Sequence, residues 1–109
     1  MDDDLPFNGV KVLDLSQGVA APYCGMMLAR NGASVIKVEP PGTGCWSRQL
    51  GKHKGDQTAH SVVVHRGKRS LGLNLKTDEG LKIAKKIAAQ CNVVLQNYRV
   101  GKIDKFGLD

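Results

Sequence analysis

Two short apolar runs on either side of one helical segment constrain the fold more strongly than any other part of the sequence. Val10 to Leu15 is rich in valine and leucine, and Ser34 to Glu39 is a second β-branched run that Pro40 ends. Between them, Pro22 suits the first turn of a helix that runs to about Arg30, because its missing N–H needs no partner there. This succession predicts a βαβ unit with two parallel strands.

A second unit of the same kind follows further along the chain. Leucines alternate with small or polar residues over residues 71–75, which is the period-two pattern of a strand with one buried face. Thr77 is a natural N-cap for an amphipathic helix that ends near Cys91, and residues 92–96 form a further strand. Two consecutive βαβ units predict an α/β fold within one domain over residues 1–109, with a parallel sheet that is incomplete in this stretch.

The segments outside these two units carry weaker signals. Residues 42–60 contain four glycines among polar residues and predict a long loop, of a kind that is usually functional or disordered. A valine cluster at residues 61–65 is consistent with either a short strand or a turn of helix. Residues 102–106 predict one more helical turn before Gly107.

A cationic stretch from His65 to Thr77 leads into the strand expected at residues 71–75. With a formal net charge of +6, the chain favours anionic partners, and phosphate-bearing small molecules and nucleic acid both qualify. Aromatic residues make up only 5% of the chain, which gives few stacking surfaces for bases and argues against nucleic acid. Charge alone does not separate the two kinds of partner.

Other features bear on the compartment. No apolar run approaches the roughly 18 residues that a membrane-spanning helix needs, and the acidic start lacks the basic flank of a secretory signal. Cys24, Cys45 and Cys91 are widely spaced and match no disulfide or metal pattern, so we expect reduced thiols. These features predict a cytoplasmic protein without a membrane partner.

Few residues qualify for catalysis on sequence alone. Gly18 is the only glycine of the first strand-to-helix loop, which therefore lacks the glycine-rich fingerprint of a dinucleotide site. Cys45 lies near Arg48, and a nearby cation can activate a thiol, but no base accompanies it. The histidines have no paired carboxylate, and Asp14 is better interpreted as a buried, hydrogen-bonded structural group. We assign no catalytic residue and no metal site within this stretch.

Several motifs occur in a fixed order along the chain. They are Val-Leu-Asp-Leu at 12–15, Ala-Pro at 21–22, the runs 32–44 and 66–77, and Asn-Tyr-Arg at 97–99. Together they resemble the N-terminal part of a family III CoA-transferase, the CaiB/BaiF group that includes formyl-CoA transferase and α-methylacyl-CoA racemase. The resemblance covers residues 5–109 in order and with the spacing kept.

The resemblance implies a longer protein with a Rossmann-like large domain, a small domain, and two subunits threaded into an interlocked homodimer. Its substrates would be an acyl-CoA and a carboxylic acid acceptor, with coenzyme A as the group transferred and no metal. An aspartate of such enzymes attacks the acyl-CoA to give an acyl-aspartyl anhydride. By motif order this aspartate lies downstream of Asp109, so we expect the segment alone to be inactive.

Carried over residue by residue, the resemblance also implies a set of CoA-binding residues in the loops that follow the strands. They are Gly18, Val19, Ala20, Leu73, Lys76, Asn97, Tyr98, Arg99, Lys105 and Phe106. Lys105 stands where an arginine is common, and it supplies a point charge without the bidentate fork. The chain departs from the family pattern at Ala21, Cys45, Gln96 and Val100, and these departures bear on acyl specificity.

The resemblance changes the interpretation of the cationic stretch, because it moves the ligand to the far end of the strand, at Leu73 and Lys76. Arg66, Lys68 and Arg69 then provide either long-range attraction for a polyanionic cofactor or a subunit contact.

Two alternatives stay open at this point. An acyl-CoA racemase of the same family would keep the scaffold but remove and replace an α-proton. A non-catalytic anion- or nucleic-acid-binding module would instead use the cationic stretch, and it predicts salt-sensitive binding to nucleic acid that exceeds binding to CoA.

Overall fold

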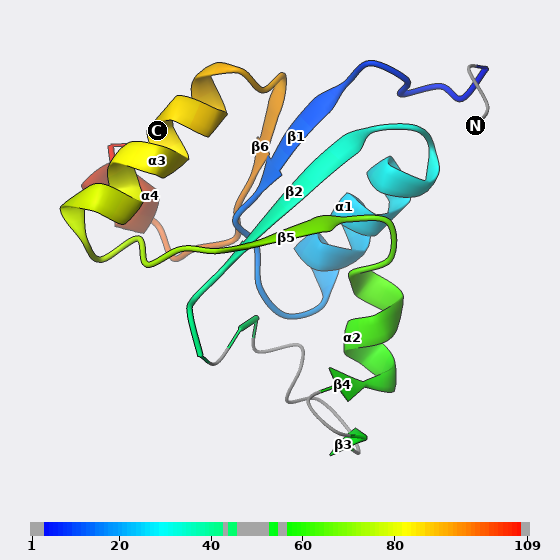
Figure 1. Cartoon of the computed structure of the whole chain (residues 1–109), viewed down its shortest axis with the longest axis horizontal. Coiled ribbons are helices and arrows are strands. Elements are labelled where there is room, and N and C mark those ends of the chain that lie inside the picture. The colour runs from blue at the N-terminus through cyan, green and yellow to red at the C-terminus, as the bar shows by residue number, and fades with distance from the viewer. Residues whose placement is uncertain (1–3, 43, 46–52, 55–56, 108–109) are drawn as a thin grey trace.

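The computed structural model describes residues 4–42, 44–45, 53–54 and 57–107, and at its centre is a four-stranded sheet (Figure 1). The strands lie in the order β5-β2-β1-β6, and every neighbouring pair is parallel. Their bounds are Lys11–Asp14 for β1, Ser34–Glu39 for β2, Arg69–Gly72 for β5 and Val93–Leu95 for β6. The predicted α/β fold with a parallel sheet is confirmed.

Helices cover both faces of this sheet. Helices α1 (Ala20–Arg30) and α2 (Ala59–Val64) lie on one side, and α3 (Asp78–Ala89) and α4 (Lys102–Lys105) lie on the other (Figure 1). A small antiparallel pair, β3 (His53–Lys54) and β4 (Gln57–Thr58), precedes α2. None of the described helices is long and apolar enough to cross a membrane.

The sheet divides the core into two apolar clusters. On the α3 side, Leu13 and Val38 pack in one cluster with Ala84. On the α1 side, Val12 and Val35 form a second cluster with apolar residues of α1. Neighbouring residues of β1 therefore point to opposite faces, as the period of a strand requires, and a parallel strand covered on both faces is apolar throughout.

Threonine side chains cap α3 and α2 at their N-termini. Thr77 Oγ1 accepts a hydrogen bond from the N–H of Gly80 at 3.1 Å, which confirms the predicted cap of α3. Thr58 and Ser61 form a reciprocal capping box at α2, in which each side chain accepts from the other residue's N–H. Both caps fix where a helix begins after an extended segment.

The strand expected over residues 71–75 lies further toward the N-terminus, because β5 ends at Gly72. Its partner β2 ends at Glu39, since Pro40 cannot donate to a ladder. The N–H of Leu73 still donates to the carbonyl of Glu39 at 2.9 Å, and the chain then turns. Leu71, Leu73 and Leu75 nevertheless pack in a single cluster. The predicted bounds of the strand were therefore wrong, but the prediction that these leucines share one buried face is confirmed.

Other boundaries also differ from the sequence prediction. Helix α1 begins at Ala20, two residues before Pro22, which still falls in the first turn. Most of the valine cluster at 61–65 belongs to α2, so helix and not strand is correct there. The expected long loop over residues 42–60 includes β3, β4 and the start of α2, and its residues 43, 46–52 and 55–56 lie outside the described residues.

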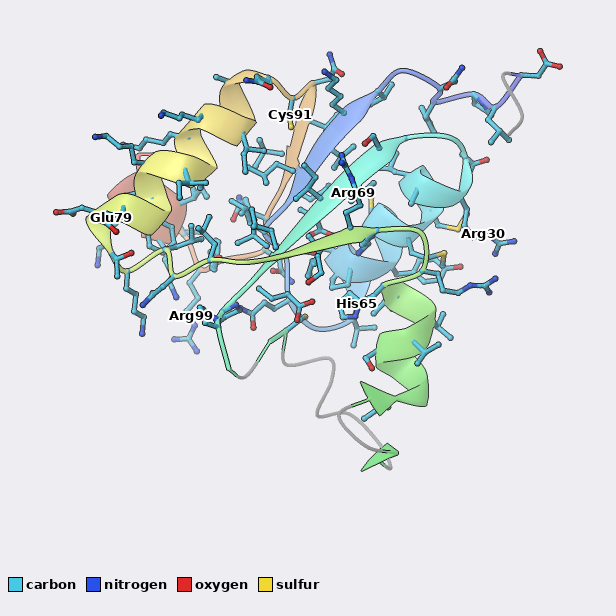
Figure 2. The ribbon with its side chains drawn as sticks, in the orientation of Figure 1. Arg30, His65, Arg69, Glu79, Cys91 and Arg99 are labelled. Atoms are coloured by element: carbon cyan, nitrogen blue, oxygen red, sulfur yellow. The ribbon has the colours of Figure 1, made fainter. Side chains whose placement is uncertain are left out.

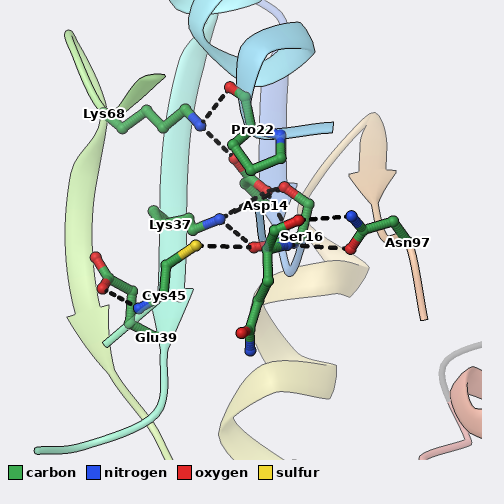
Figure 3. A network of polar contacts seen from close by, with 9 residues as sticks. Asp14, Ser16, Pro22, Lys37, Glu39, Cys45, Lys68 and Asn97 are labelled. Carbon is green, nitrogen blue, oxygen red and sulfur yellow. Dashed lines mark hydrogen bonds and ion pairs between the residues drawn. The ribbon is translucent and has the colours of Figure 1, made fainter. Parts of the chain in front are cut away.

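A buried ion-pair network joins three strands beneath α1 (Figure 3). Asp14 at the end of β1 is fully buried, and its Oδ2 accepts a hydrogen bond from Lys68 Nζ at 2.7 Å. Lys37 of β2 places its Nζ 3.6 Å from Oδ1 of the same carboxylate. Lys68, which directly precedes β5, also donates to the carbonyl of Pro22 at 2.9 Å. The network thus ties β1, β2 and the start of β5 to α1.

The expectation that Lys68 attracts a cofactor or contacts a subunit is wrong. Its side chain is only 1% exposed, and its ammonium group is bonded to Asp14 and Pro22. Burial lowers the pKa of Lys68, and the charge of Asp14 acts in the opposite direction. The interpretation of Asp14 as a buried, hydrogen-bonded carboxylate is confirmed.

Gly25 of α1 leaves the space that the Asp14–Lys68 pair occupies. A Cβ atom at this position would lie 2.6 Å from Asp14 Oδ2 and 2.9 Å from Lys68 Nζ. Alanine is ordinarily the better helix former. We nevertheless expect Gly25→Ala to lower the free energy of unfolding by about 1–3 kcal/mol, because the added methyl group overpacks the pair. Urea denaturation followed by circular dichroism measures this change.

Gly72→Ala is the matched control for this experiment. A Cβ atom at Gly72 of β5 would meet nothing within 4 Å, so this substitution should change the free energy of unfolding by no more than about 0.5 kcal/mol. If Gly25→Ala were as stable as the unsubstituted chain, the close packing of α1 on the ion pair would be contradicted.

Candidate functional site

The C-terminal ends of the four parallel strands meet at one edge of the sheet, where the following loops enclose a pocket of about 450 Å³. Open α/β sheets bind ligands at this edge, next to the point where successive crossovers leave toward opposite faces. Here β1 and β6 flank that point, because α1 follows β1 on one face and α3 precedes β6 on the other. The pocket therefore lies where this fold class usually holds a ligand.

All four strands contribute to the lining of this pocket. The lining residues are Gln17 after β1, Val38, Pro40 and Pro41 at the end of β2, Leu73 to Lys76 after β5, and Tyr98, Lys102 and Phe106 after β6. A neighbouring pocket of about 350 Å³ is lined by Gln17, Asn97, Tyr98, Arg99 and Lys102. Three residues line both pockets, so the two are adjoining parts of one surface.

An aromatic pair forms one wall of the larger pocket. The rings of Tyr98 and Phe106 are 5.6 Å apart and inclined at 73°, an edge-to-face arrangement. Lys102 Nζ lies 5.0 Å from the centre of the Tyr98 ring, within the range of a cation–π interaction. Burial raises the pKa of the Tyr98 phenol, so the ring stays neutral beside the cation. The wall offers a flat apolar surface next to a positive charge.

The charges around the two pockets all have one sign. Lys76, Arg99 and Lys102 are exposed, and the lining residues in the described part of the chain include no carboxylate. Arg99, labelled in Figure 2, lies in the segment after β6 and lines the smaller pocket at this edge of the sheet. Such a surface attracts anions, because its lining presents cations and no carboxylate among the described residues.

The structure brings six of the ten predicted site residues to these pockets. Leu73, Lys76, Tyr98 and Phe106 line the larger pocket, and Asn97, Tyr98 and Arg99 line the smaller one. The other four line neither pocket. Gly18 is buried with φ of 89°, Val19 and Ala20 are exposed at the start of α1, and Lys105 is exposed on α4.

Three polar lining residues were not predicted from the sequence. Gln17 comes directly before Gly18, and Asn74 comes directly after Leu73, so proximity to a predicted site residue was the available signal. Lys102 gave no such signal, because a lysine in a short helical turn is usually solvated. Only its position over the Tyr98 ring identifies it.

A third pocket of about 220 Å³ lies at the opposite edge of the sheet. It is lined by the first residues of three strands, Lys11, Ser34 and Arg69, and by the last turn of α3 with Cys91. Burial raises the pKa of the Cys91 thiol, which disfavours the reactive thiolate. All three cysteines are free. Among the described residues, no three His, Cys, Asp or Glu side chains are grouped to hold a metal ion.

Comparison with known proteins settles the family. The sequence profile of CoA-transferase family III matches residues 7–109. The chain belongs to this family. The resemblance to family III that the order of the motifs indicated is thereby confirmed.

Relatives with assigned activities are similar along the whole of this chain. It is 41% identical over 109 residues to human succinyl-CoA:glutarate CoA-transferase, covering 99% of this chain and 25% of that protein. It is 40% identical over 104 residues to succinyl-CoA–D-citramalate CoA-transferase of Chloroflexus aurantiacus, covering 94% of this chain and 26% of that protein. The chain spans about a quarter of the length of the curated relatives it matches.

Solved structures agree with the family III fold. A CAIB/BAIF family protein from Brucella suis has a TM-score of 0.82 and 36% identity, covering 95% of this chain and 29% of that one. A hypothetical protein from Mycobacterium tuberculosis has a TM-score of 0.85 and 36% identity, covering 95% of this chain and 28% of that one. The arrangement of the strands and helices is therefore shared with both proteins.

The raised pKa of Tyr98 can be measured by alkaline titration of tyrosine absorbance. We expect one phenol to ionise above its ordinary pKa of 10.0, and the Tyr98→Phe substitution to remove that late component. Because the folded-state pKa lies above the unfolded one, the stability that the neutral phenol contributes is lost as the pH rises through this window. Circular dichroism at each pH shows whether the chain stays folded. An unchanged late component in Tyr98→Phe would contradict the burial of this ring.

Proposed function

We propose that this chain forms the CoA-binding part of an acyl-CoA:carboxylate CoA-transferase. Membership of family III supports the reaction class. The observation that carries the binding role is the cationic, aromatic-walled pocket at the C-terminal edge of the sheet. A pocket of this composition suits a ligand that is anionic, aromatic and partly apolar.

CoA combines these properties in one molecule. It has a phosphorylated adenosine, a pyrophosphate and a long pantetheine arm that carries the thiol. In our proposal Lys76, Arg99 and Lys102 bind the phosphates, because they are exposed cations at the described lining, which includes no carboxylate. Tyr98 and Phe106 present an apolar surface to the adenine.

Five further predicted contacts are Leu73, which lines the larger pocket, and four residues that line neither pocket. Leu73 supplies apolar surface next to Lys76, and it lines the larger pocket. Gly18, Val19 and Ala20 are proposed to lie along the part of acyl-CoA that extends toward the reacting thioester. Lys105 is proposed to supply a further charge for a phosphate from α4.

The covalent chemistry is proposed to belong to an aspartate outside residues 1–109. Its carboxylate would attack the acyl-CoA thioester to form an acyl-aspartyl anhydride and release the CoA thiolate. The thiolate would then attack the aspartyl carbonyl, which gives an aspartyl-CoA thioester and frees the first acid. The second carboxylate would attack the aspartyl-CoA thioester, which forms a new anhydride and releases the CoA thiolate again. Attack of this thiolate on the acceptor's carbonyl would give the new acyl-CoA and free the aspartate. The part played by this chain is to hold CoA in place while its acyl partner changes.

The names of the relatives narrow the substrate class. They include succinyl-CoA transferases that act on glutarate, D-citramalate, L-malate and mesaconate. We therefore propose succinyl-CoA as the donor and a small dicarboxylic acid as the acceptor. An interlocked homodimer in the cytoplasm belongs to the same proposal.

The nucleic-acid alternative loses part of its support in the structure. Lys68, at the centre of the cationic stretch, is buried against Asp14 and offers no charge to a phosphate backbone. The relatives reported above are named CoA-transferases, which favours a transferase over a racemase.

Calorimetric titration with CoA tests the proposed function. We expect Lys76→Ala and Lys102→Ala each to raise the dissociation constant for CoA by about tenfold, as expected for a lost hydrogen bond to a charged group. Lys82→Ala is the matched control, because Lys82 is an exposed lysine of α3 that lines none of the three pockets. It should change the dissociation constant by less than about twofold.

Duplex DNA is the competing ligand in the same titration. A chain that bound DNA more tightly than CoA at physiological salt, with all three lysine variants equally affected, would contradict the CoA-binding role.

A further inference from the structure

The side chain of Asn97, just after β6, is bonded to the backbone of the loop that follows β1 (Figure 3). Its Oδ1 accepts a hydrogen bond from the N–H of Gln17 at 3.0 Å, and its Nδ2 donates to the carbonyl of Gln17 at 2.6 Å. One amide side chain thus pairs with both backbone polar groups of a single residue, 80 positions away in the sequence.

The backbone of Ser16, the residue before Gln17, is also held by two hydrogen bonds, which involve side chains of β1 and β2. The N–H of Ser16 donates to Asp14 Oδ1 at 2.9 Å, and Lys37 Nζ donates to the carbonyl of Ser16. Hence all four backbone polar groups of Ser16 and Gln17 are hydrogen-bonded within the protein. The backbone of these two residues is therefore already bonded within the protein, and this part of the loop contributes to a ligand site through its position and its side chains.

Asn97 also lies where the two loops separate. The N–H of Leu15 donates to the carbonyl of Leu95 at 2.9 Å, which is the last backbone hydrogen bond described between these two segments. Beyond it, the chain after β1 enters α1 on one face of the sheet, and the chain after β6 leads to α4 on the other. The Asn97 amide extends the pairing of the two segments by one step with a side chain in place of backbone.

Both pockets depend on the distance between these loops. Gln17 contributes from the first loop, and Tyr98 and Lys102 contribute from the second, to both pockets. If the loops moved apart, these side chains would no longer face one ligand. The bridge from Asn97 to Gln17 is the described contact that fixes their separation at this point.

We propose that Asn97 is a positioning residue for CoA, which joins the two halves of the pocket while its amide group stays bonded to Gln17. The family resemblance places Asn97 among the CoA-binding residues, and the geometry assigns its side chain a different task from a direct contact. This inference rests on the proposed function, because it takes CoA as the ligand of the pocket.

The test uses the full chain with the substitution Asn97→Ala and calorimetric titration with CoA. Removing both hydrogen bonds frees the loop, and we expect the dissociation constant for CoA to rise by about tenfold. An unchanged dissociation constant would overturn the proposal.

Asn92→Ala is the matched control. Asn92 precedes β6, and its Oδ1 accepts a hydrogen bond from the N–H of Lys11 at 2.8 Å, so it joins the same two segments at the opposite edge of the sheet. Its substitution should lower stability without moving the CoA dissociation constant by more than about twofold. If Asn92→Ala weakened CoA binding as much as Asn97→Ala, loss of stability would explain both results, and the positioning role would be overturned.

A measurement without ligand separates positioning from direct contact. In the CoA-free chain, amide hydrogen exchange at Gln17, followed by nuclear magnetic resonance, should speed up in Asn97→Ala and stay unchanged in Asn92→Ala. Weaker CoA binding with unchanged exchange at Gln17 would mean that Asn97 acts by touching the ligand, which overturns the proposal.

Failure of the proposed function gives a different pattern. The unsubstituted chain would then show no CoA binding, and both proposals would fall together. Failure of the positioning role alone leaves CoA binding by the unsubstituted chain intact.

Discussion

The structure depends on one buried carboxylate. Asp14 is fully buried between Lys37, which belongs to β2, and Lys68, which directly precedes β5. Two ammonium groups beside one carboxylate are tolerable because each also donates a hydrogen bond to a backbone carbonyl, Lys68 to that of Pro22 and Lys37 to that of Ser16. Removing the carboxylate would leave unpaired cations in the core, at a cost of about 3–5 kcal/mol. The same group that holds the strands therefore also holds the loop at Ser16.

The position of the candidate site follows from this arrangement of strands and loops. The strand order places the C-terminal ends of β1 and β6 side by side at the point where the chain leaves for opposite faces. Asp14 and Lys37 fix the backbone of Ser16, and Asn97 fixes that of Gln17. The pocket between these loops has cations and aromatic rings because the segments after β5 and β6 supply them. Family III membership, together with that composition, is the basis of the proposal that this surface binds CoA.

Hydrophobic periodicity predicted the parallel sheet and α3, because apolar alternation and capping act locally. It misplaced β5 because the end of that strand is decided by its neighbour β2, which stops at Pro40. Sequence reasoning placed Asp14 correctly, since a carboxylate inside an apolar strand has to be paired. It missed the role of Lys68, because a lysine within a run of charges is usually solvated, and its partner lies 54 residues away.

We propose that CoA lies at the C-terminal edge of this sheet, next to the loop after β1. The side chains of Asp14, Lys37 and Asn97 hold this loop in place. The most direct measurement is a nuclear magnetic resonance titration of the full chain with CoA, read residue by residue. We predict shift changes concentrated at Leu73, Lys76, Tyr98 and Phe106, around the larger pocket. Changes concentrated instead around the 220 Å³ pocket with Lys11, at the opposite edge of the sheet, would contradict this claim.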